Sequence, residues 1–576
     1  ATFRLPMGFY LYIALIRRTS STFPSLFTSF IFSDHIFTRV FPSPPLYSTL
    51  PMAQASKFQI LIRVDQRTGE YVLGPTSSTS EEIDDLLAHI LPEHFATPLH
   101  NDLPHSILRS TDFWPSTNLD KSKGDNLTPY TSWFTSMSER HSADWERFGI
   151  RQALEVTRVN IPIQWDFIIS LVHFWNPQIN AFVFPSGIVG ISLVDIYVLL
   201  GLPVEGDPLC VFDAEKPTAA GLRIPGSFSS YGKLVETFRS ISQKRVSDPI
   251  AIYGSGWVQW SEEEQHRLLT REERAHQEHR AFLLLWVSRY LTSNQSKGPK
   301  MSLTPLVDKI LEGRRIPLAE YLLGLLYNAI TNLQKSWFEG SPKNVSGPLW
   351  FLRLWGAYRF RNFLGLSLPS VTNPDFSRTL ASIKFPSISV NRYLKFFMSI
   401  TPGEGPDPQW HYDYRRLPQV CFQSMANLDA RQPLPRADSR TWSRFLTARL
   451  LFPGGTYPQA SSDPLVHLTV AYNPHFFAMT FGLSQGLPRV LRYDEVNANN
   501  IRIVKNQTLV DLGSHTVRAF DVTRSPKSSF VRWWTNKACP RLFPDRSAMI
   551  SRAVRPPGWC SSFIDCAYTS SFANSF

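Results

Sequence analysis

Residues 165–206 constrain the fold of this chain more than any other stretch, because they predict two helices and a strand with hardly a spare residue between them. The first helix is predicted over residues 165–176, where apolar side chains recur at helical spacing and would pack on one face. That stripe consists of Trp165, Ile168, Ile169, Val172 and Trp175. Pro177 is expected to end this helix, since proline lacks a backbone N–H.

A short strand and a capped second helix follow. Residues 181–184 are aromatic and favour a strand, which Gly187 would close in a turn. Ser192 and Asp195 then form a capping-box pattern, in which both side chains satisfy backbone N–H groups at the start of a helix over residues 192–200. Its predicted end is marked by Gly201, Leu202 and Pro203. Every position in the stretch has a structural interpretation, and none is an obvious catalyst.

The rest of the chain predicts further helices. A β-hairpin is expected over residues 58–73, where apolar and polar residues alternate around a glycine-containing turn, and an acidic Ser/Thr-rich stretch follows over 75–90. Further helices are predicted from Ser261 through the apolar run 281–287 towards Tyr290, over 317–333 and over 348–360. We therefore predict a mainly α fold with a few short strands, as one large helical domain beside a small hairpin region and irregular tails.

Composition sets the expected domain boundaries. Residues 1–51 are interpreted as a leader or upstream segment outside the fold, and residues 52–130 as the hairpin and a linker. The main domain is expected over 131–540, followed by a basic and disordered tail over 541–576. The apolar run at 8–16 is too short to span a bilayer. Because residues 1–50 are rich in serine and arginine with one acid, an organellar transit peptide remains an alternative.

Four motifs in one order give the chain a resemblance to a known family. They are F-W-N-P to L-L-G-L-P-V-E-G within 165–206, R-R-I-P-L-A-E-Y-L-L-G-L-L-Y at 314–327, G-P-L-W-F-L-R-L-W at 347–355, and Y-N-P-H-F-F to F-G-L-S-Q-G-L-P at 472–488 with F-V-R-W-W at 530–534. This series resembles the plant mobile domain, a family often labelled "aminotransferase-like". The positions that carry the resemblance are Trp175, Phe184, Gly187, Asp195, Gly201, Leu202, Pro203, Gly347, Pro348, Trp350 and Gly482.

The resemblance implies a function as well as a fold. Members of this family are non-catalytic nuclear proteins associated with gene-expression control, silencing of transposable elements and meristem maintenance. Some of them work with a protein-phosphatase-like partner. The domain also occurs inside transposons, which leaves an element-derived copy open. The resemblance therefore implies a nuclear protein that binds protein partners, with no membrane and no small-molecule substrate.

Charge is distributed unevenly along the chain, whose net charge is +12. Residues 351–576 hold 27 Lys and Arg against 13 Asp and Glu, whereas residues 1–350 hold 32 against 34. A basic half is typical of contact with nucleic acid, although scattered arginines also simply solvate a helical surface. The candidate contacts are Arg353, Arg359, Arg361, Arg415, Arg416 and Arg532. On one helix the first three would point in different directions, so we expect at most weak binding.

The sequence contains one enzyme-like pattern, G-x-S-x-G, centred on Ser484. In a serine hydrolase this pattern forms a strained turn between a strand and a helix, beside a histidine held by an acid. Asp494, Asp511 and His515 follow in the order that such a triad requires. The chain lacks the alternating strands and helices of that fold, so a family-type turn is the favoured interpretation. A hydrolase using Ser484 is kept as the alternative.

Metal and cofactor sites are not indicated. Glu272, His276 and His279 have the spacing of ligands on one helix, yet no third ligand is evident and a solvated face is the favoured interpretation. The five cysteines form no C-x-x-C pair. No lysine stands in a recognisable pyridoxal phosphate context, and phosphate-binding glycine loops are absent. We therefore expect neither a catalytic residue nor a cofactor.

Overall fold

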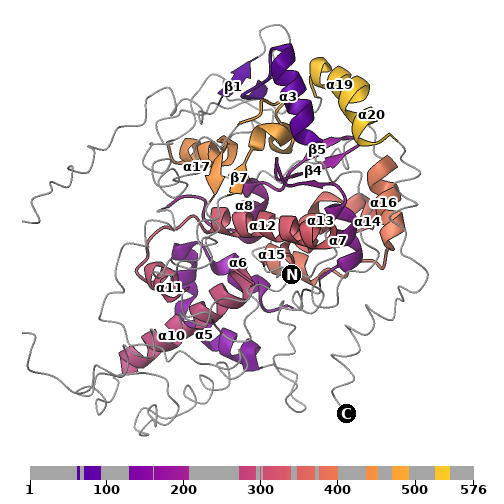
Figure 1. Ribbon diagram of the computed structural model, residues 1–576. Coiled ribbons are helices and arrows are strands. Elements are labelled where there is room, and N and C mark those ends of the chain that lie inside the picture. The colour runs from indigo at the N-terminus through magenta and orange to yellow at the C-terminus, as the bar shows by residue number, and fades with distance from the viewer. Residues whose placement is uncertain are drawn as a thin grey trace, which may run out of the picture. The chain divides into compact units, whose positions relative to one another are not determined.

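The computed structural model describes thirteen parts of the chain (Figure 1), namely residues 61–64, 71–91, 129–159, 161, 163–206, 271–293, 299, 303–338, 347–369, 375–399, 436–451, 470–491 and 526–544. The chain divides into two units, residues 1–56 and 57–576, and every described residue belongs to the second. Among the described residues, no helix is long and apolar enough to cross a membrane.

Most of the described residues lie in helices, and the strands form small two- and three-stranded sheets. The N-terminal part contains β1 (Leu61–Val64), β2 (Tyr71–Gly74), α3 (Ser80–Ile90), α5 (Pro129–Phe148), α6 (Arg151–Val156), α7 (Trp165–Val172), β3 (Trp175–Asn176), β4 (Ala181–Phe184), β5 (Gly187–Val189) and α8 (Leu193–Leu200). The middle contains α10 (Arg271–Trp286), the π-helix η5 (Val287–Leu291), α11 (Thr304–Leu311), α12 (Leu318–Phe338), α13 (Phe351–Arg359), α14 (Arg361–Leu364), α15 (Phe376–Ser382) and α16 (Val390–Ser399). The C-terminal part contains α17 (Arg436–Leu446), β6 (Arg449–Leu451), β7 (Val470–Tyr472), the 3₁₀ helix η9 (Pro474–Phe481), α19 (Ser528–Trp533), the π-helix η12 (Trp534–Ala538) and α20 (Cys539–Leu542). The prediction of a mainly α fold with a few short strands is confirmed.

Helix α12 forms the centre of the core. It packs against α7, α8 and the short strands β3, β6 and β7, while α13 packs against α8 (Figure 1). The predicted helices over 317–333 and 348–360 correspond to α12 and α13. The part of the predicted helix after Ser261 that is described is α10 with η5, which reaches Leu291; residues 261–270 lie outside the described residues.

The capped helix over 192–200 is confirmed as α8. The Ser192 N–H donates to Asp195 Oδ2 at 2.6 Å, and the Asp195 N–H donates to Ser192 Oγ at 3.3 Å, which completes the capping box. Gly201 ends the helix at φ 68°, in the left-handed region that glycine enters without steric cost. The strand over 181–184 and the turn at Gly187 are also confirmed, as β4 and its connection to β5.

The helix predicted over 165–176 was too long. Helix α7 ends at Val172, and Trp175 with Asn176 forms β3, which pairs antiparallel with β4. Gln334 of α12 explains the early end, because its Nε2 donates to Val172 O at 3.1 Å and to Trp175 O at 2.6 Å. The Trp175 indole N–H donates to Thr331 Oγ1 at 2.9 Å. Tertiary contacts therefore overrode the local helical pattern before Pro177 was reached.

The predicted hairpin is confirmed as β1 and β2, which pair antiparallel. The acidic stretch 75–90 contains a helix that the sequence analysis had left without structure. Helix α3 begins with a second capping box, made by Thr79 and Glu82. The hairpin joins the large helical core, since Val72 bridges Ser484 in parallel and the Ser77 N–H donates to Leu487 O at 2.8 Å.

Candidate functional site

A buried ion pair connects α8 to α13 at the centre of the motif series. Arg359 Nε and Nη2 donate to Asp195 Oδ1 at 3.1 and 2.8 Å, and the two side chains are 3% and 0% exposed. The second carboxylate oxygen accepts from the Ser192 N–H and from its hydroxyl at 2.6 and 2.7 Å. One carboxylate thus caps α8 and fixes α13 beside it. This constellation is enclosed in the core, where a substrate does not reach it.

The structure corrects two of the predicted nucleic-acid contacts. Arg359 is held by Asp195, and Arg353 is buried, donates from Nη2 to Ile383 O at 2.5 Å and lies over the Phe385 ring. Neither guanidinium is on a surface that a nucleic acid can reach, because both stabilise packing around α13. Arg361 is partly exposed and Arg532 is exposed. Arg415 and Arg416 lie outside the described residues.

The other motif positions also hold elements together. Trp175, Phe184 and Leu202 are fully buried. Gly347 has φ 137°, and a Cβ added there would lie 2.6 Å from the Ala329 Cβ, so only glycine allows this approach to α12. The Pro203 carbonyl accepts from the Ala319 N–H at 3.0 Å, and the Trp350 indole donates to Tyr290 O at 3.1 Å. Pro348 lies before α13, which begins at Phe351, so the start predicted at residue 348 was too early.

Ser484 does not stand in a nucleophile elbow. The 3₁₀ helix η9 precedes it, with Gly482 as its C-cap, and no helix follows it within the described residues up to 491. Ser484 is fully buried and pairs by its backbone with Val72 of β2, whereas an elbow exposes its serine between a strand and a helix. Gln485 fixes the turn, since its side chain accepts from the Ala478 N–H and donates to His475 O. Asp494, Asp511 and His515 lie outside the described residues.

The three residues with metal-ligand spacing on one helix do not lie together, because some are exposed and one is buried. Glu272 and His276 are exposed, whereas His279 is buried and its Nε2 accepts from the Trp145 indole at 2.9 Å. His279 also stacks on His141 of α5, with ring centroids 3.8 Å apart. Burial, followed by the charge of His141, lowers the pKa of His279 to about 3. His279 is therefore neutral at physiological pH, and it joins α10 to α5.

Sequence analysis missed the acid at the centre of this contact. Glu278 is buried and accepts from the Trp133 indole at 2.9 Å and from Arg140 Nη1 at 2.7 Å. A partial signal was available in α5, where Trp133 and Arg140 are seven residues apart and so lie on one face of the helix, towards a neighbouring element. The partner helix lies more than 130 residues further along the chain, so the sequence did not identify it.

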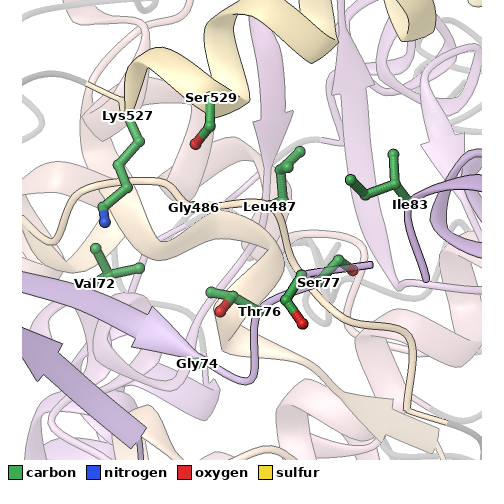
Figure 2. Close-up of a pocket in the computed structure, with 10 residues that line it drawn as sticks. Val72, Gly74, Thr76, Ser77, Ile83, Gly486, Leu487, Lys527 and Ser529 are labelled. Atoms are coloured by element: carbon green, nitrogen blue, oxygen red, sulfur yellow. The ribbon is translucent and has the colours of Figure 1, made fainter. Parts of the chain in front are cut away.

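A pocket of about 440 Å³ opens where β2, α3, the Ser484 turn and the start of α19 meet (Figure 2). Its apolar wall is formed by Val72, Ile83 and Leu487, and hydroxyl groups and one ammonium group complete it. The polar side chains are those of Thr76, Ser77, Ser78, Lys527 and Ser529. Among the described residues that line it, none is a carboxylate or an imidazole, and Lys527 is the titratable group of its lining.

Comparisons with known proteins find similarity to one family model and to one relative. Residues 149–384 match the model of the plant mobile domain family, which confirms the resemblance. Over 208 residues the chain is 26% identical to a protein of Arabidopsis thaliana named "Serine/threonine-protein phosphatase 7 long form homolog". The aligned part covers 34% of this chain and 13% of that relative. No solved structure matches the chain.

Proposed function

We propose that this chain, which carries a plant mobile domain over residues 149–384, is a non-catalytic nuclear protein that acts through protein partners. Its role would lie in gene-expression control, in silencing of transposable elements and in meristem maintenance. The family resemblance supports this assignment. An element-derived origin of the gene is part of the same proposal.

One observation supports the non-catalytic part most directly. Asp195, the buried acid of the motif series, is occupied on both oxygens by Arg359 and Ser192. The carboxylate therefore has no oxygen left over for a substrate, and it is enclosed at 0% exposure. Ser484 is fully buried in a turn that Gln485 fixes. These groups stabilise the fold, which is the expected use of polar residues in an interaction domain.

A phosphatase-type protein is the partner that we propose. The matched segment makes up 13% of a relative that is named for a phosphatase, which places a domain of this type within a phosphatase-named chain. We infer that the present chain contacts a protein of that class in the nucleus. The test is affinity purification of the tagged chain from nuclei. We expect a phosphatase-type protein to be recovered with the wild-type chain, and to be lost with a chain whose plant mobile domain is unfolded.

Complementation of a plant line that lacks the gene tests the proposal as a whole. We expect wild-type chain and Ser484→Ala to restore silencing of transposable elements equally, because a buried turn serine has no chemical role. Arg359→Met should fail, since it breaks the core of the domain. A tagged chain that stays outside the nucleus, or a line whose silencing is normal without the gene, would refute the nuclear role.

The hydrolase alternative is tested on the folded protein. A fluorophosphonate probe should leave Ser484 unmodified, because the side chain is fully buried. Labelling of Ser484 that disappears when His515 is replaced by alanine would instead establish an activated serine and end the non-catalytic proposal.

A further inference from the structure

Residues 526–544 form a helix with one widened turn. Helix α19 continues through the π-helix η12 into α20, and the Cys539 N–H donates to Trp534 O, five residues earlier. A π turn inserts one extra residue into an α-helix and so shifts every later side chain around the axis. This shift determines which residues of the helix are buried and which are exposed.

The widened turn keeps one apolar face continuous. Phe530, Trp534, Cys539 and Phe543 are buried at spacings of four, five and four, and Trp533, Ala538 and Leu542 are buried at five and four. The Trp534 indole donates to Pro185 O at 2.8 Å, which fixes this helix beside β4. In an uninterrupted α-helix, the residue four after Trp533 would be Lys537, and an ammonium group would enter the core.

The same turn aligns cations on the opposite face. Ser528, Arg532, Lys537 and Arg541 are exposed, again at spacings of four, five and four. Within residues 526–544 there are four cations and no acid. In the part of the chain that the structure describes, Arg532, Lys537 and Arg541 form no ion pair. We call these three residues the cationic row; they extend over about 13 Å at 1.5 Å per residue.

We propose that the cationic row binds the phosphate backbone of duplex DNA. This inference goes beyond the proposed function and does not depend on it. The remaining exposed residues of the helix include Thr535 and Asn536, which are further donors to phosphate oxygens. The exposed face carries no aromatic or large aliphatic residue, and such residues are the usual anchors of a protein interface. Net charge agrees, since residues 351–576 hold 27 Lys and Arg against 13 acids.

The proposed contact is non-specific in sequence. Its groups are cations and small donors that suit phosphate oxygens, and the exposed face of the helix presents no aromatic ring for stacking on bases. The row is rigid, because its opposite face is buried and held by the Trp534 indole. Rigid alignment lowers the entropy cost of placing three charges along one strand. Thus the π turn, which the core requires, also produces the binding surface.

The test is a titration of the full-length chain into fluorescently labelled duplex DNA of arbitrary sequence, followed by anisotropy between 50 and 200 mM salt. Three phosphate contacts predict a slope of log K against log salt of about −2.7, at roughly −0.9 per contact. Each single change, R532Q, K537Q or R541Q, should reduce the magnitude of the slope by about 0.9. The triple variant should lose the salt dependence that the row contributes.

A matched control separates position from net charge. K384Q/R392Q/K395Q removes three exposed cations from other elements of the same basic half and changes the net charge equally. We expect this control to keep the wild-type slope. Equal losses in the two triple variants, or no binding of duplex by the wild-type chain, would overturn the proposal. Binding of polyglutamate without binding of duplex would assign the row to an acidic protein and overturn it as well. Circular dichroism and the denaturation midpoint verify that each variant is folded.

Discussion

Replacing Arg359 by methionine should destabilise the domain by about 3–5 kcal/mol, which is the usual cost of removing one partner of a buried ion pair. The reason lies in the exposure of the pair. Arg359 is 3% exposed and Asp195 is 0% exposed, so the change removes the guanidinium from a carboxylate that stays enclosed in the core. Such a loss is a large part of the 5–15 kcal/mol that ordinarily stabilises a folded protein.

Urea unfolding of the full chain, followed by tryptophan fluorescence and circular dichroism, measures this loss. With an m-value near 2 kcal/mol per molar, the midpoint should fall by roughly 2 M. Asp195→Asn alone should also be costly, because the guanidinium then stays buried without a charge partner. The double variant D195N/R359M should cost clearly less than the sum of the two single changes, since no uncompensated charge remains.

A surface pair on α5 provides the control. Arg147 Nη2 lies 2.8 Å from Asp144 Oδ1, the same distance as in the buried pair, yet the two side chains are 69% and 39% exposed. Arg147→Met should therefore cost less than about 0.5 kcal/mol. If Arg359→Met cost no more than Arg147→Met, or if the costs at 195 and 359 were simply additive, the reasoning from burial would be wrong.

Three further outcomes are expected. Ser484→Ala should leave the chain folded and unreactive towards fluorophosphonates, as measured by its denaturation midpoint and by gel fluorescence. Because the pKa of His279 is lowered to about 3 while its unfolded value is near 6.5, the unfolded state binds more protons between those values, so stability is complete above pH 6.5 and falls as the pH decreases. Between pH 7 and 5 this histidine should remove about 2 kcal/mol, and in His279→Gln the decrease should be smaller by that amount. Deletion of the exposed Asn536 should convert the π turn to α geometry and keep both faces of the helix. A loss of more than about 1 kcal/mol in the free energy of unfolding, or loss of the DNA contact, would contradict the alignment inferred from η12.

Local signals gave reliable predictions where the local chain alone determines the outcome. Ser192, Asp195 and Gly201 were identified from the sequence as the two ends of α8, because capping boxes and left-handed glycines act within a single turn. A second capping box, at Thr79 and Glu82, was just as readable and marks the start of α3. The stretch 75–90 was interpreted from its acidic, Ser/Thr-rich composition instead of from this capping pattern, so the helix was not predicted.

Contacts between distant segments account for the predictions that were wrong. Trp175 fits the apolar stripe of α7, and a local reading placed it in that helix. Its place in β3 depends on Gln334 and Thr331, more than 150 residues further along. Arg359 looked like a phosphate ligand because its partner Asp195 is 164 residues earlier. The periodicity of a helix or strand carries no information about partners that are far apart in the chain. Residue type alone therefore could not distinguish a buried guanidinium from an exposed one.

Residues 165–206, the stretch that constrains the fold most, also form polar contacts with distant segments of the chain. Side chains and backbone carbonyls of the stretch form hydrogen bonds with separate parts of the chain, and the pairs are Asn176 with Ile90 O, Asn180 with Ala471 O, Gln334 with Trp175 O, Arg359 with Asp195, and Trp534 with Pro185 O. Each pair removes the cost of burying an unpaired polar group, about 1–3 kcal/mol. A change at one of these positions therefore disturbs packing between distant segments. Residues 165–206 are therefore the part of the chain to which distant segments are joined within the core.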